Sequence, residues 1–354
     1  MNHHTLPMLS VVIVSFNTAA LLYDCLRSLF AACEAIALEV IVVDNASRDG
    51  SVAMVRAEFP QARLIANRRN VGFGVANNQA VAVARAPYVM LLNSDTIVPP
   101  GAIERLLREL DRTPDLGLVG PRLIGADGKV QRSAFRFPTP KALLLEQLNL
   151  ARFLPAARRA HQPDETCARS VDWLIGACVL GRRDLLAALG PFDPRFFMYG
   201  EDIDLCYRMR RAGLDIRLAP CAAITHLGGM SARRDRVRMA LQATESMYLF
   251  YRKHYSERAL LLAALIFRAS AALKSLRDLV RLIWLTLAGR DREQRAGVLM
   301  DLQVWQALLF LLPPALARQG DEPEGDRAVA TDEPGIDRSA LRQRVVGDDA
   351  RAEV

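Results

Sequence analysis

The 354-residue sequence lacks the motifs of several large enzyme classes. It contains neither a GxGxxG fingerprint nor a glycine-rich loop ending in Gly-Lys-Ser or Gly-Lys-Thr, so ordinary NAD- and ATP-dependent enzymes are disfavoured. Its six cysteines show no CxxC and no paired spacing, which argues against a disulfide framework and against a zinc site. We interpret them as small buried apolar residues in a reducing compartment.

A signal-peptide layout is also missing. His3 and His4 precede a strand-like apolar run, whereas a secretory signal begins with a charged region and continues with an apolar one. We therefore expect a cytoplasmic domain that begins at about residue 8.

Charge is distributed unevenly along the chain. The formal net charge is +7, but Asp321–Val354 contains ten acidic and five basic residues, a net of −5, which leaves +12 on the first 320 residues. A basic body suits an anionic partner: a nucleotide diphosphate, a lipid phosphate, a membrane surface or nucleic acid. Apolar residues make up 51% of the chain, which excludes wholesale disorder and supports one large α/β domain with appendages, or two smaller domains.

The first half of the chain alternates apolar runs with helical patterns. Asn17 or Thr18 is a candidate cap for the first helix. This alternation predicts an α/β fold with a central, mostly parallel sheet covered by helices on both faces. The predicted strands are Leu9–Ser15, Leu38–Asp44, Arg63–Ala66 and Tyr88–Leu92.

Each predicted strand ends in a polar cluster. In parallel sheets ligands bind beyond the carboxyl ends of the strands, so this coincidence is the first functional signal. Asp44 is placed to accept hydrogen bonds from a base or ribose, or else to cap the next turn. The glycines of Asn70–Gly74 let the backbone approach an anionic ligand at a helix start. The clusters are Ser15–Asn17, Asp44–Ser47, Asn67–Asn70 and Asn93–Asp95.

The segment Asn93-Ser94-Asp95 is a candidate metal site. A carboxylate at the mouth of the sheet suits Mg²⁺ or Mn²⁺ beside a diphosphate, because both cations prefer oxygen ligands. The alternative is that the segment caps a helix over Ile97–Leu110.

Glu201 and Asp202 belong to the densest acidic cluster of the patterned region. The pattern predicts a helix from Glu201 to Arg211, and acids in its first turn also suit the helix dipole. The aromatic segment Phe196–Tyr199 precedes them, and an apolar setting raises the pKa of a carboxylate toward the range of a general base.

His226 and Trp173 are further candidates. His226 follows a predicted strand at Ile216–Pro220 and precedes Gly228-Gly229, and it is either a ligand for metal or diphosphate or a packed, hydrogen-bonded side chain. Trp173 precedes Gly176-Ala177 and either belongs to the core or lines an acceptor groove.

Taken in chain order, these motifs resemble the family-2 inverting glycosyltransferases of GT-A fold, and among them the rhamnosyltransferase-like branch. The resemblance covers residues 8–255 and implies a metal-dependent enzyme that moves a sugar from a nucleotide-diphosphate donor. The matching segments are Val11–Asn17, Ile41–Gly50, Asn70–Asn78, Leu91–Asp95, Trp173–Ala177 and Tyr199–Arg208.

The resemblance also implies a role for each position. Asp44 would bind the nucleobase, Asp95 would hold Mg²⁺ or Mn²⁺, and His226 would help to hold the metal or the diphosphate. Asp202 would be the catalytic base, with Glu201 beside it. Further implied donor contacts are Ser15, Asn17, Asn45, Asn70, Gly72, Asn93 and Ser94, and implied acceptor contacts are Trp173, Gly176 and Ala177.

The implied reaction is a single displacement with inversion. The expected donor is dTDP-L-rhamnose, or alternatively a UDP-hexose. The expected acceptor is a polyprenyl-linked saccharide or a polysaccharide of the cell envelope. One departure is Asn93, where many relatives carry an aspartate, so the metal site has one charge fewer.

Two rival functions fit less well. A nucleotidyltransferase would carry a glycine-rich basic loop after the first strand, where this chain has Ser15–Ala20 without glycine or a basic residue. A nucleic-acid partner is not expected, because acids at successive strand ends would repel phosphate backbones.

The region after residue 255 has a different composition. Residues 256–318 are rich in Leu and Ala, and their longest charge-free stretch before Gly289 is about nine residues, short of the roughly 20 that span a bilayer. Lys274, Arg277 and Arg281 share one side of a helical wheel, which predicts an in-plane helix on the inner face of the cytoplasmic membrane. The alternative is packing against the domain or against a twin subunit in a homodimer. Residues 132–165 predict a long, partly ordered loop, and residues 319–354 a disordered acidic tail.

Overall fold

The computed structural model describes residues 7–147, 168–228, 235–289 and 292–313. These residues form two compact units, which we call the sheet unit (residues 7–137 and 168–228) and the helical unit (residues 138–147, 235–289 and 292–313). The sheet unit contains every candidate site residue. The helical unit takes in residues 138–147 and 235–255, which precede the domain boundary expected at residue 256.

A 10-stranded mixed sheet forms the centre of the sheet unit, in the order β3-β2-β1-β4-β11-β6-β12-β5, with β7 paired to β6 and β9 paired to β12. Strands β1 to β4 pair with one another in parallel, and β11 runs antiparallel between β4 and β6. A separate two-stranded sheet pairs β8 with β10. The strands are β1 Leu9–Ser15, β2 Leu38–Asp44, β3 Arg63–Ala66, β4 Tyr88–Asn93, β5 Thr96–Ile97, β6 Leu116–Ile124, β7 Val130–Gln131, β8 Ala134–Phe135, β9 Arg169–Ser170, β10 Trp173–Leu174, β11 Cys178–Arg182 and β12 Asp215–His226.

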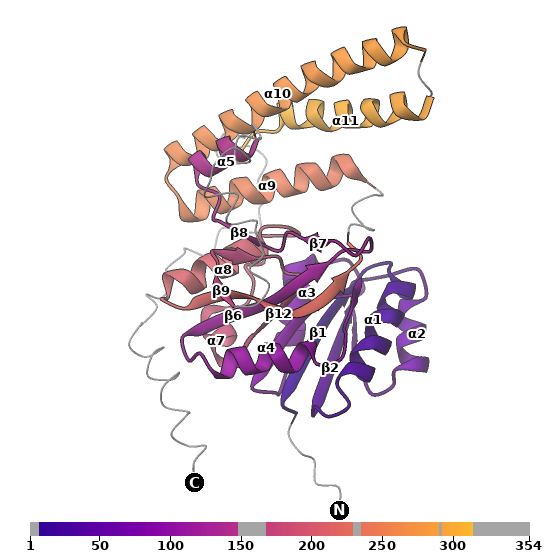
Figure 1. Ribbon diagram of the computed structural model, residues 1–354, viewed down its shortest axis with the longest axis vertical. Coiled ribbons are helices and arrows are strands. Elements are labelled where there is room, and N and C mark those ends of the chain that lie inside the picture. The colour runs from indigo at the N-terminus through magenta and orange to yellow at the C-terminus, as the bar shows by residue number, and fades with distance from the viewer. Residues whose placement is uncertain (1–6, 148–167, 229–234, 290–291, 314–354) are drawn as a thin grey trace, which may run out of the picture. The chain divides into compact units, whose positions relative to one another are not determined.

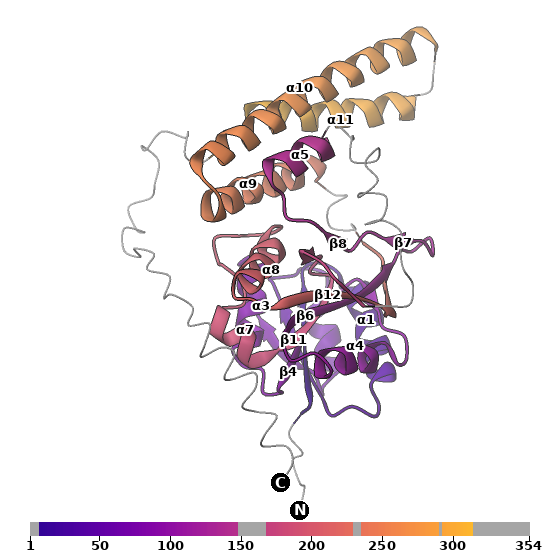
Figure 2. The same ribbon diagram turned by 60° about the vertical axis from the view of Figure 1, so that its left-hand side comes forward.

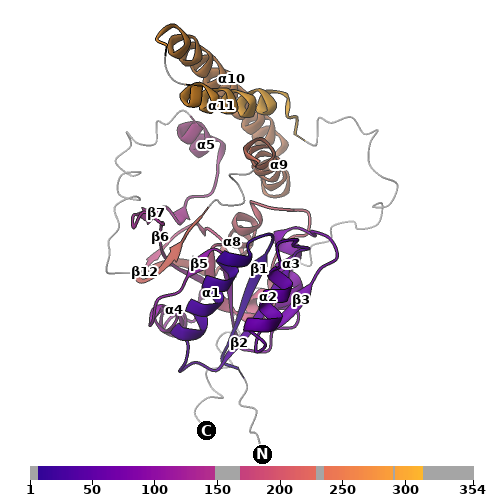
Figure 3. The same cartoon turned by 90° about the vertical axis from the view of Figure 1, so that its right-hand side faces the viewer.

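Helices cover both faces of the main sheet (Figures 1 and 3). Alternate side chains of β1 explain why, since Val11 and Ile13 enter one core cluster and Val12 and Val14 the other. The first cluster takes its helical residues from α1, α2 and α4, and the second from α3, α7 and α8. The predicted α/β architecture is confirmed. These helices are α1 Ala19–Ala32, α2 Ser51–Glu58, α3 Phe73–Val81, α4 Ala102–Asp111, α7 Arg183–Leu189 and α8 Glu201–Arg211.

The segment after Asp95 differs from the prediction. Thr96–Ile97 form strand β5, and α4 begins only at Ala102. Pro99-Pro100 stands between them, and a proline disfavours helical backbone in the residue before it. The prediction of a helix from Ile97 is therefore wrong at its N-terminal end, and Asp95 does not cap a helix.

The stretch predicted as a long loop contains regular structure in its described part. Residues 134–135 form β8, and Pro140–Gln147 form helix α5, whereas residues 148–165 lie outside the described residues. A hairpin turns at Asp127-Gly128, where β7 pairs antiparallel with β6 and Gly128 has a φ of 74°. The acidic tail expected at 319–354 also lies outside the described residues.

The helical unit consists of α5 together with α9 (Arg236–His254), α10 (Glu257–Leu287) and α11 (Arg292–Phe310). Helices α10 and α11 lie side by side (Figures 1 and 2). By length and composition, α10 is apolar enough to cross a membrane, a test that the core helix of a soluble protein also passes. The sequence analysis expected charged residues to interrupt this region too often for a membrane span. The structure instead shows one continuous helix of 31 residues whose length and composition would allow it to span.

Candidate functional site

Three neighbouring strands bring the first predicted site residues to one edge of the sheet. The register pairs Ser15 with Asp44, and Val14 with Asn93, so β1, β2 and β4 end at the same level. A chain of hydroxyl groups crosses this edge, because the Thr18 Oγ1 lies 2.9 Å from the Ser15 Oγ and 3.0 Å from the Ser94 Oγ. The predicted contacts of the donor therefore meet at the carboxyl ends of parallel strands.

Asp44 offers one free carboxylate oxygen at this edge. Its Oδ1 accepts a hydrogen bond from the backbone N–H of Ser47 at 2.9 Å. Its Oδ2 is buried and has no hydrogen-bond partner among the described residues. Because an unpaired buried acceptor is costly, this oxygen is suited to a ligand's N–H or O–H.

The neighbouring turn is built differently from the expected helix cap. Asn17 has a φ of 55°, and its Oδ1 accepts from the backbone N–H of Arg48 at 2.8 Å. Thr18 precedes α1 but makes no side-chain capping bond. The first N–H of the helix, that of Ala19, instead donates to the Oδ2 of Asp49 at 2.7 Å. The predicted cap by Asn17 or Thr18 is therefore wrong, since a loop residue supplies it.

Asn45 organises the loop that follows β3. Its Nδ2 donates to the Oδ1 of Asn70 at 2.8 Å and to the carbonyl of Gly72 at 3.2 Å. Its Oδ1 accepts from the N–H of Val71 at 3.0 Å and from the Nδ2 of Asn67 at 3.2 Å. The side chain of Asn45 is 3% exposed and its amide is fully engaged within the protein. It acts on the site by shaping the 67–72 loop.

Gly72 lies in the 67–72 loop, at the place where the segment containing Phe197 passes close to it. A Cβ at this position would lie 2.7 Å from the carbonyl oxygen of Phe197, which accepts a hydrogen bond from the N–H of Phe73 at 2.8 Å. Its φ of 89° also favours glycine. The side chain of Asn78 pairs with both backbone groups of Phe192, at 2.7 and 3.0 Å. The segment that leads into α8 is thus held against the start and the middle of helix α3.

Asp95 and His226 meet on the other side of the edge. The Nε2 of His226 lies 3.4 Å from the Oδ1 of Asp95, and both side chains are mostly buried. The backbone N–H of Leu227 donates to the carbonyl of Asp95 at 2.9 Å. The Nδ1 of His226 lies 2.9 Å from the Oε1 of Gln131. Asp95 and His226 are 131 positions apart in the sequence but share one corner of the site.

The side-chain oxygen and nitrogen atoms at this corner fit a divalent cation that also binds a substrate diphosphate. Within the described residues there is no group of three or more His, Cys, Asp or Glu side chains that could hold a metal. Mg²⁺ and Mn²⁺ sites, however, are often made by one or two protein groups plus substrate phosphates. Asp95 and His226 supply two such groups, and the buried Oδ1 of Asn93 has no hydrogen-bond partner within the part of the chain that the structure describes.

The two acids at the start of α8 have different surroundings. The Oδ2 of Asp202 accepts from the N–H of Gly176 at 3.1 Å, and its Oδ1 accepts from the N–H of Ile203 at 2.8 Å. Burial raises the pKa of Asp202, and these two donors offset part of the effect. Glu201 is 5% exposed and its Oε2 has no partner among the residues described. Burial first, and then the charge of Asp202, raise the pKa of Glu201 well above its usual range.

This difference separates the chemical roles of the two carboxyl groups. Hydrogen bonds from backbone N–H groups favour the charged form of Asp202. The Oε2 of Glu201 has no such partner among the described residues, and the neighbouring charge of Asp202 opposes its ionisation. Asp202 is therefore the candidate for a general base.

The loop before α8 is held by a buried ion pair. The Nε of Arg208 donates to the Oδ2 of Asp204 at 2.9 Å, one helical turn away. The guanidinium group also donates to the carbonyls of Leu189, Gly190 and Pro191. Arg208 therefore fixes the start of the loop whose other end carries Glu201 and Asp202.

Trp173 lies on the small sheet, in strand β10, which contacts helix α8. Its indole Nε1 donates to the carbonyl of Arg136 at 3.0 Å, and its ring stacks on Phe135 at a centroid distance of 4.5 Å. The ring packs partly against the core. Its neighbours Gly176 and Ala177 contribute backbone groups, the first to Asp202 and the second to Asn93, whose N–H donates to the Ala177 carbonyl at 2.9 Å.

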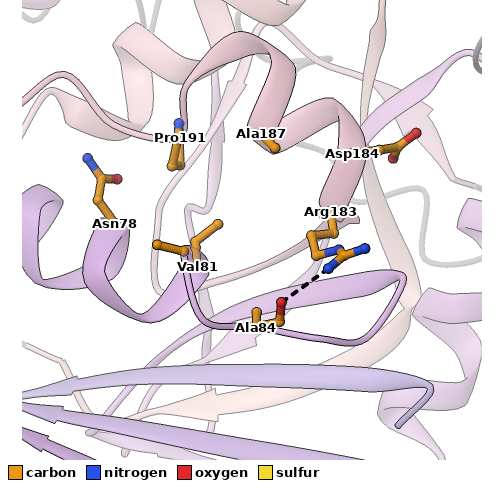
Figure 4. Close-up of a pocket in the computed structure, with 8 residues that line it drawn as sticks. Asn78, Val81, Ala84, Arg183, Asp184, Ala187 and Pro191 are labelled. Carbon is orange, nitrogen blue, oxygen red and sulfur yellow. Dashed lines mark hydrogen bonds between the residues drawn. The ribbon is translucent and has the colours of Figure 1, made fainter. Parts of the chain in front are cut away.

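A pocket of about 360 Å³ lies elsewhere in the sheet unit, between α3 and α7 (Figure 4). Arg183 points into this region and donates to the carbonyl of Ala84 at 3.2 Å. None of the predicted site residues lines the pocket, and we assign it no role in the reaction.

Three contributors to the site were not singled out from the sequence. Gln131 and Asn78 contact partners 95 and 114 residues away, and no local pattern marks such contacts. Arg208 lies four positions after Asp204 on a predicted helix, so the spacing of opposite charges does indicate that pair.

Comparisons with known proteins show the family to which the chain belongs. The family model described as "Glycosyl transferase family 2" matches residues 10–189. The chain is 33% identical over 266 residues to an N-acetylglucosaminyl-diphospho-decaprenol L-rhamnosyltransferase of Mycobacterium tuberculosis, covering 70% of this chain and 85% of that protein. It is 24% identical over 251 residues to the low-salt glycan biosynthesis hexosyltransferase Agl10 of Haloferax volcanii, covering 70% and 74%.

A solved structure shares the fold. The mannosyltransferase PcManGT from Pyrobaculum calidifontis, solved in complex with GDP-Man and Mn²⁺, aligns with a TM-score of 0.51 over 86% of each chain. The two sequences are 19% identical, so this likeness shows the fold alone.

Proposed function

Because the chain belongs to glycosyl transferase family 2 and is a glycosyltransferase of the GT-A fold, we propose that it transfers L-rhamnose from dTDP-L-rhamnose to a saccharide carried on a lipid diphosphate. The activity of the mycobacterial relative supports this choice of donor and acceptor. A UDP-hexose is the alternative donor, and the hexosyltransferase of Haloferax volcanii supports that reading.

The setting of Asp202 carries the proposal. The carboxylate is held by two backbone N–H groups, which favour its charged form, and the pKa of the neighbouring Glu201 is raised by burial and by the charge of Asp202. It removes the proton from an acceptor hydroxyl, whose oxygen then bonds to the anomeric carbon. The bond from that carbon to the diphosphate breaks on the opposite face, and the electron pair leaves with dTDP. Configuration at the anomeric carbon is inverted.

Other residues of the chain bind and orient the donor. The free Oδ2 of Asp44 accepts a hydrogen bond from the nucleobase, and the hydroxyl chain of Ser15, Thr18 and Ser94 lies beside the sugar-nucleotide. Asp95 and His226 would hold Mg²⁺ or Mn²⁺. When bound, the cation neutralises the charge of the diphosphate leaving group. Asn93 contributes an uncharged oxygen where an aspartate would add a charge.

We further propose that the helical unit rests on the inner surface of the cytoplasmic membrane. Three polar residues of α10 are engaged inside the unit: Arg268 donates to the carbonyl of Leu309, Lys274 to the Oε1 of Gln147, and Asp278 accepts from Trp305. Large apolar side chains of the same helix are exposed instead: Leu262, Leu265, Leu273, Leu276, Val280, Ile283 and Leu287.

These exposed side chains recur at intervals of three, four or eight residues, which places them on one stripe along α10, and the exposed Ala269 lies in the longest gap. A stripe of this size rarely faces water in a soluble protein, whereas it suits the boundary between lipid headgroups and acyl chains. A lipid surface would also bring the enzyme to an acceptor carried on a membrane lipid. Dimerisation through the same stripe is the alternative.

A donor panel tests the proposed reaction. The purified enzyme is incubated with Mn²⁺, a synthetic polyprenyl-diphosphate saccharide, and either dTDP-L-rhamnose or a UDP-hexose, and the released nucleoside diphosphate is measured. We expect acceptor-dependent release of dTDP. Release of UDP alone would replace the proposed donor by the alternative, and release of neither would refute the proposed reaction.

A further inference from the structure

We propose that Gln131 is a positioning residue, which fixes the imidazole of His226 in the Nδ1–H tautomer and so turns the Nε2 lone pair toward a cation at Asp95. The inference rests on the proposed function, because the role of His226 as a metal ligand belongs to it. Gln131 is not among the residues assigned to the donor, the acceptor or the base.

The orientation of the Gln131 carboxamide follows from a backbone contact. Its Nε2 donates to the carbonyl oxygen of His226 at 2.8 Å, and a carbonyl can only accept. The other end of the carboxamide, Oε1, is therefore the atom that lies 2.9 Å from the Nδ1 of the same histidine. One side chain thus contacts both the backbone and the ring of His226.

This orientation decides the tautomer of the ring. Because Oε1 can only accept, the Nδ1 of His226 must carry the hydrogen of that bond. In a neutral ring the Nε2 then has a lone pair. That nitrogen lies 3.4 Å from the Oδ1 of Asp95, so two electron-pair donors face each other across a distance longer than a good hydrogen bond. A divalent cation is the partner that both atoms can share.

The fold holds Gln131 at this place by a tight hairpin. Gln131 pairs with Leu123 across β6 and β7. The turn is closed by bonds from the N–H of Gly125 to the carbonyl of Lys129 at 2.8 Å, and from the N–H of Gly128 to the carbonyl of Gly125 at 3.0 Å. A Cβ on Gly125 would lie 3.1 Å from the Nε2 of Gln131, so the glycine leaves room for the side chain.

The geometry also indicates what the ring would do without Gln131. A leucine has a similar size but no hydrogen-bonding groups, so the Nδ1 would lose its acceptor. The ring would then gain by placing its hydrogen on Nε2, which can donate to Asp95. In that tautomer Nε2 has no lone pair for a cation. Glutamate differs from leucine here, because its carboxylate still accepts from Nδ1–H.

The test combines a spectroscopic measurement with metal binding. Two-bond ¹H–¹⁵N correlation spectra of the full-length protein, labelled at histidine and recorded where the ring is neutral, report the tautomer of His226, which is assigned with His226→Ala. Titration of Mn²⁺ in the presence of dTDP, followed by electron paramagnetic resonance, reports cation affinity. The variants are Gln131→Leu and Gln131→Glu, with Lys129→Ala as the control, since Lys129 is exposed on the same hairpin.

We expect the Nδ1–H tautomer in the wild type, in Gln131→Glu and in Lys129→Ala, and its loss in Gln131→Leu. Manganese binding should weaken about 10-fold in Gln131→Leu, the usual size of a lost outer-shell contact, and stay unchanged in Lys129→Ala. An Nε2–H tautomer in the wild type would overturn the proposal, and so would unchanged Mn²⁺ affinity in Gln131→Leu. Unchanged affinity in His226→Ala would instead overturn the proposed metal role of His226, while glycosyl transfer is tested separately by the donor panel.

Discussion

The backbone N–H of Gly176 donates a hydrogen bond to the Oδ2 of Asp202 over 3.1 Å. Gly176 stands just before β11, which pairs with β4 through Cys178 and Leu92. The next residue, Ala177, accepts from the N–H of Asn93. Hydrogen bonds at the adjacent residues Gly176 and Ala177 therefore link Asp202 to the segment that carries Asp95. The proposed base and the candidate metal site are thus both held by the segment that leads into β11.

Asp44→Asn should weaken donor binding. The substitution keeps the side chain's size but replaces a free acceptor by an amide, of which one end donates. A hydrogen bond to a charged group contributes about 1.5–3 kcal/mol, so we expect the KM for dTDP-L-rhamnose to rise at least 10-fold. The kcat should change little, because Asp44 lies away from the base. Steady-state kinetics and calorimetric titration of dTDP measure both.

Asp24→Asn is the matched control for this substitution. Asp24 is exposed on α1 and pairs only with Arg27 in the contacts described. Its replacement should leave both kinetic constants unchanged. An unchanged KM in Asp44→Asn would contradict the assignment of Asp44 to the nucleobase.

Leu276→Glu combined with Val280→Glu should release the protein from membranes. Both side chains are more than half exposed on the α10 stripe. Burying a large apolar side chain contributes about 1.5–3 kcal/mol, so the two charges should reduce binding to anionic phospholipid vesicles by well over 10-fold. Vesicle co-sedimentation measures this, and circular dichroism checks that the helices persist.

A charge added elsewhere provides the comparison. Ala53→Glu places a new carboxylate on exposed helix α2 of the sheet unit and should not change vesicle binding. Equal binding of the wild type and the double variant would show that the stripe does not contact lipid. A wild-type dimer that the double variant converts to monomer would support the alternative.

Glu39→Gln should destabilise the fold without changing the chemistry. Glu39 is 8% exposed and accepts from the hydroxyl of Ser10 at 2.6 Å and from the Nε of Arg85 at 2.8 Å. Burial alone would raise the pKa of Glu39, but the bonds from Ser10 and Arg85 outweigh it and lower that pKa. We expect a loss of about 1–3 kcal/mol in the free energy of unfolding at neutral pH.

The pH dependence of this loss has a definite sign. A carboxyl group with a lowered pKa in the folded state contributes stability above its unfolded pKa and loses it as the pH falls through the folded pKa. The difference between the wild type and Glu39→Gln in urea denaturation should therefore shrink below the ordinary glutamate range. Glu58→Gln, an exposed substitution on α2, should show no difference at any pH. A difference for Glu39→Gln that grows on acidification would refute this account.

Local patterns were sufficient for the elements that hold the site. The strands at Leu9–Ser15 and Leu38–Asp44 and the helix from Glu201 to Arg211 agree with the prediction, because buried β-branched runs and an amphipathic segment carry strong signals. The sequence pattern also placed Asp44 and Asp95 at strand ends. Parallel pairing then brings them to one edge without further information.

Local sequence patterns could not predict the contacts between distant segments. Nothing near Gln131 indicates that its side chain lies against His226, and nothing near Ala19 indicates that Asp49 caps its helix. Asn45 was predicted as a donor contact, but its amide is satisfied by four groups of a loop that begins 22 residues later. Tertiary hydrogen bonds of this kind depend on the assembled fold rather than on the neighbouring residues.

The comparison of Asp202→Asn with Glu201→Gln tests the central claim most directly. Transfer is measured as acceptor-dependent release of dTDP, and donor binding as the Kd for dTDP in the presence of Mn²⁺. Asp202→Asn removes the base, so transfer should fall by at least 100-fold while the Kd stays within about twofold of the wild type. Glu201→Gln replaces the neighbouring carboxyl group by a neutral amide of the same shape, and most of the activity should remain. Near-normal transfer by Asp202→Asn would contradict the assignment of Asp202 as the catalytic base.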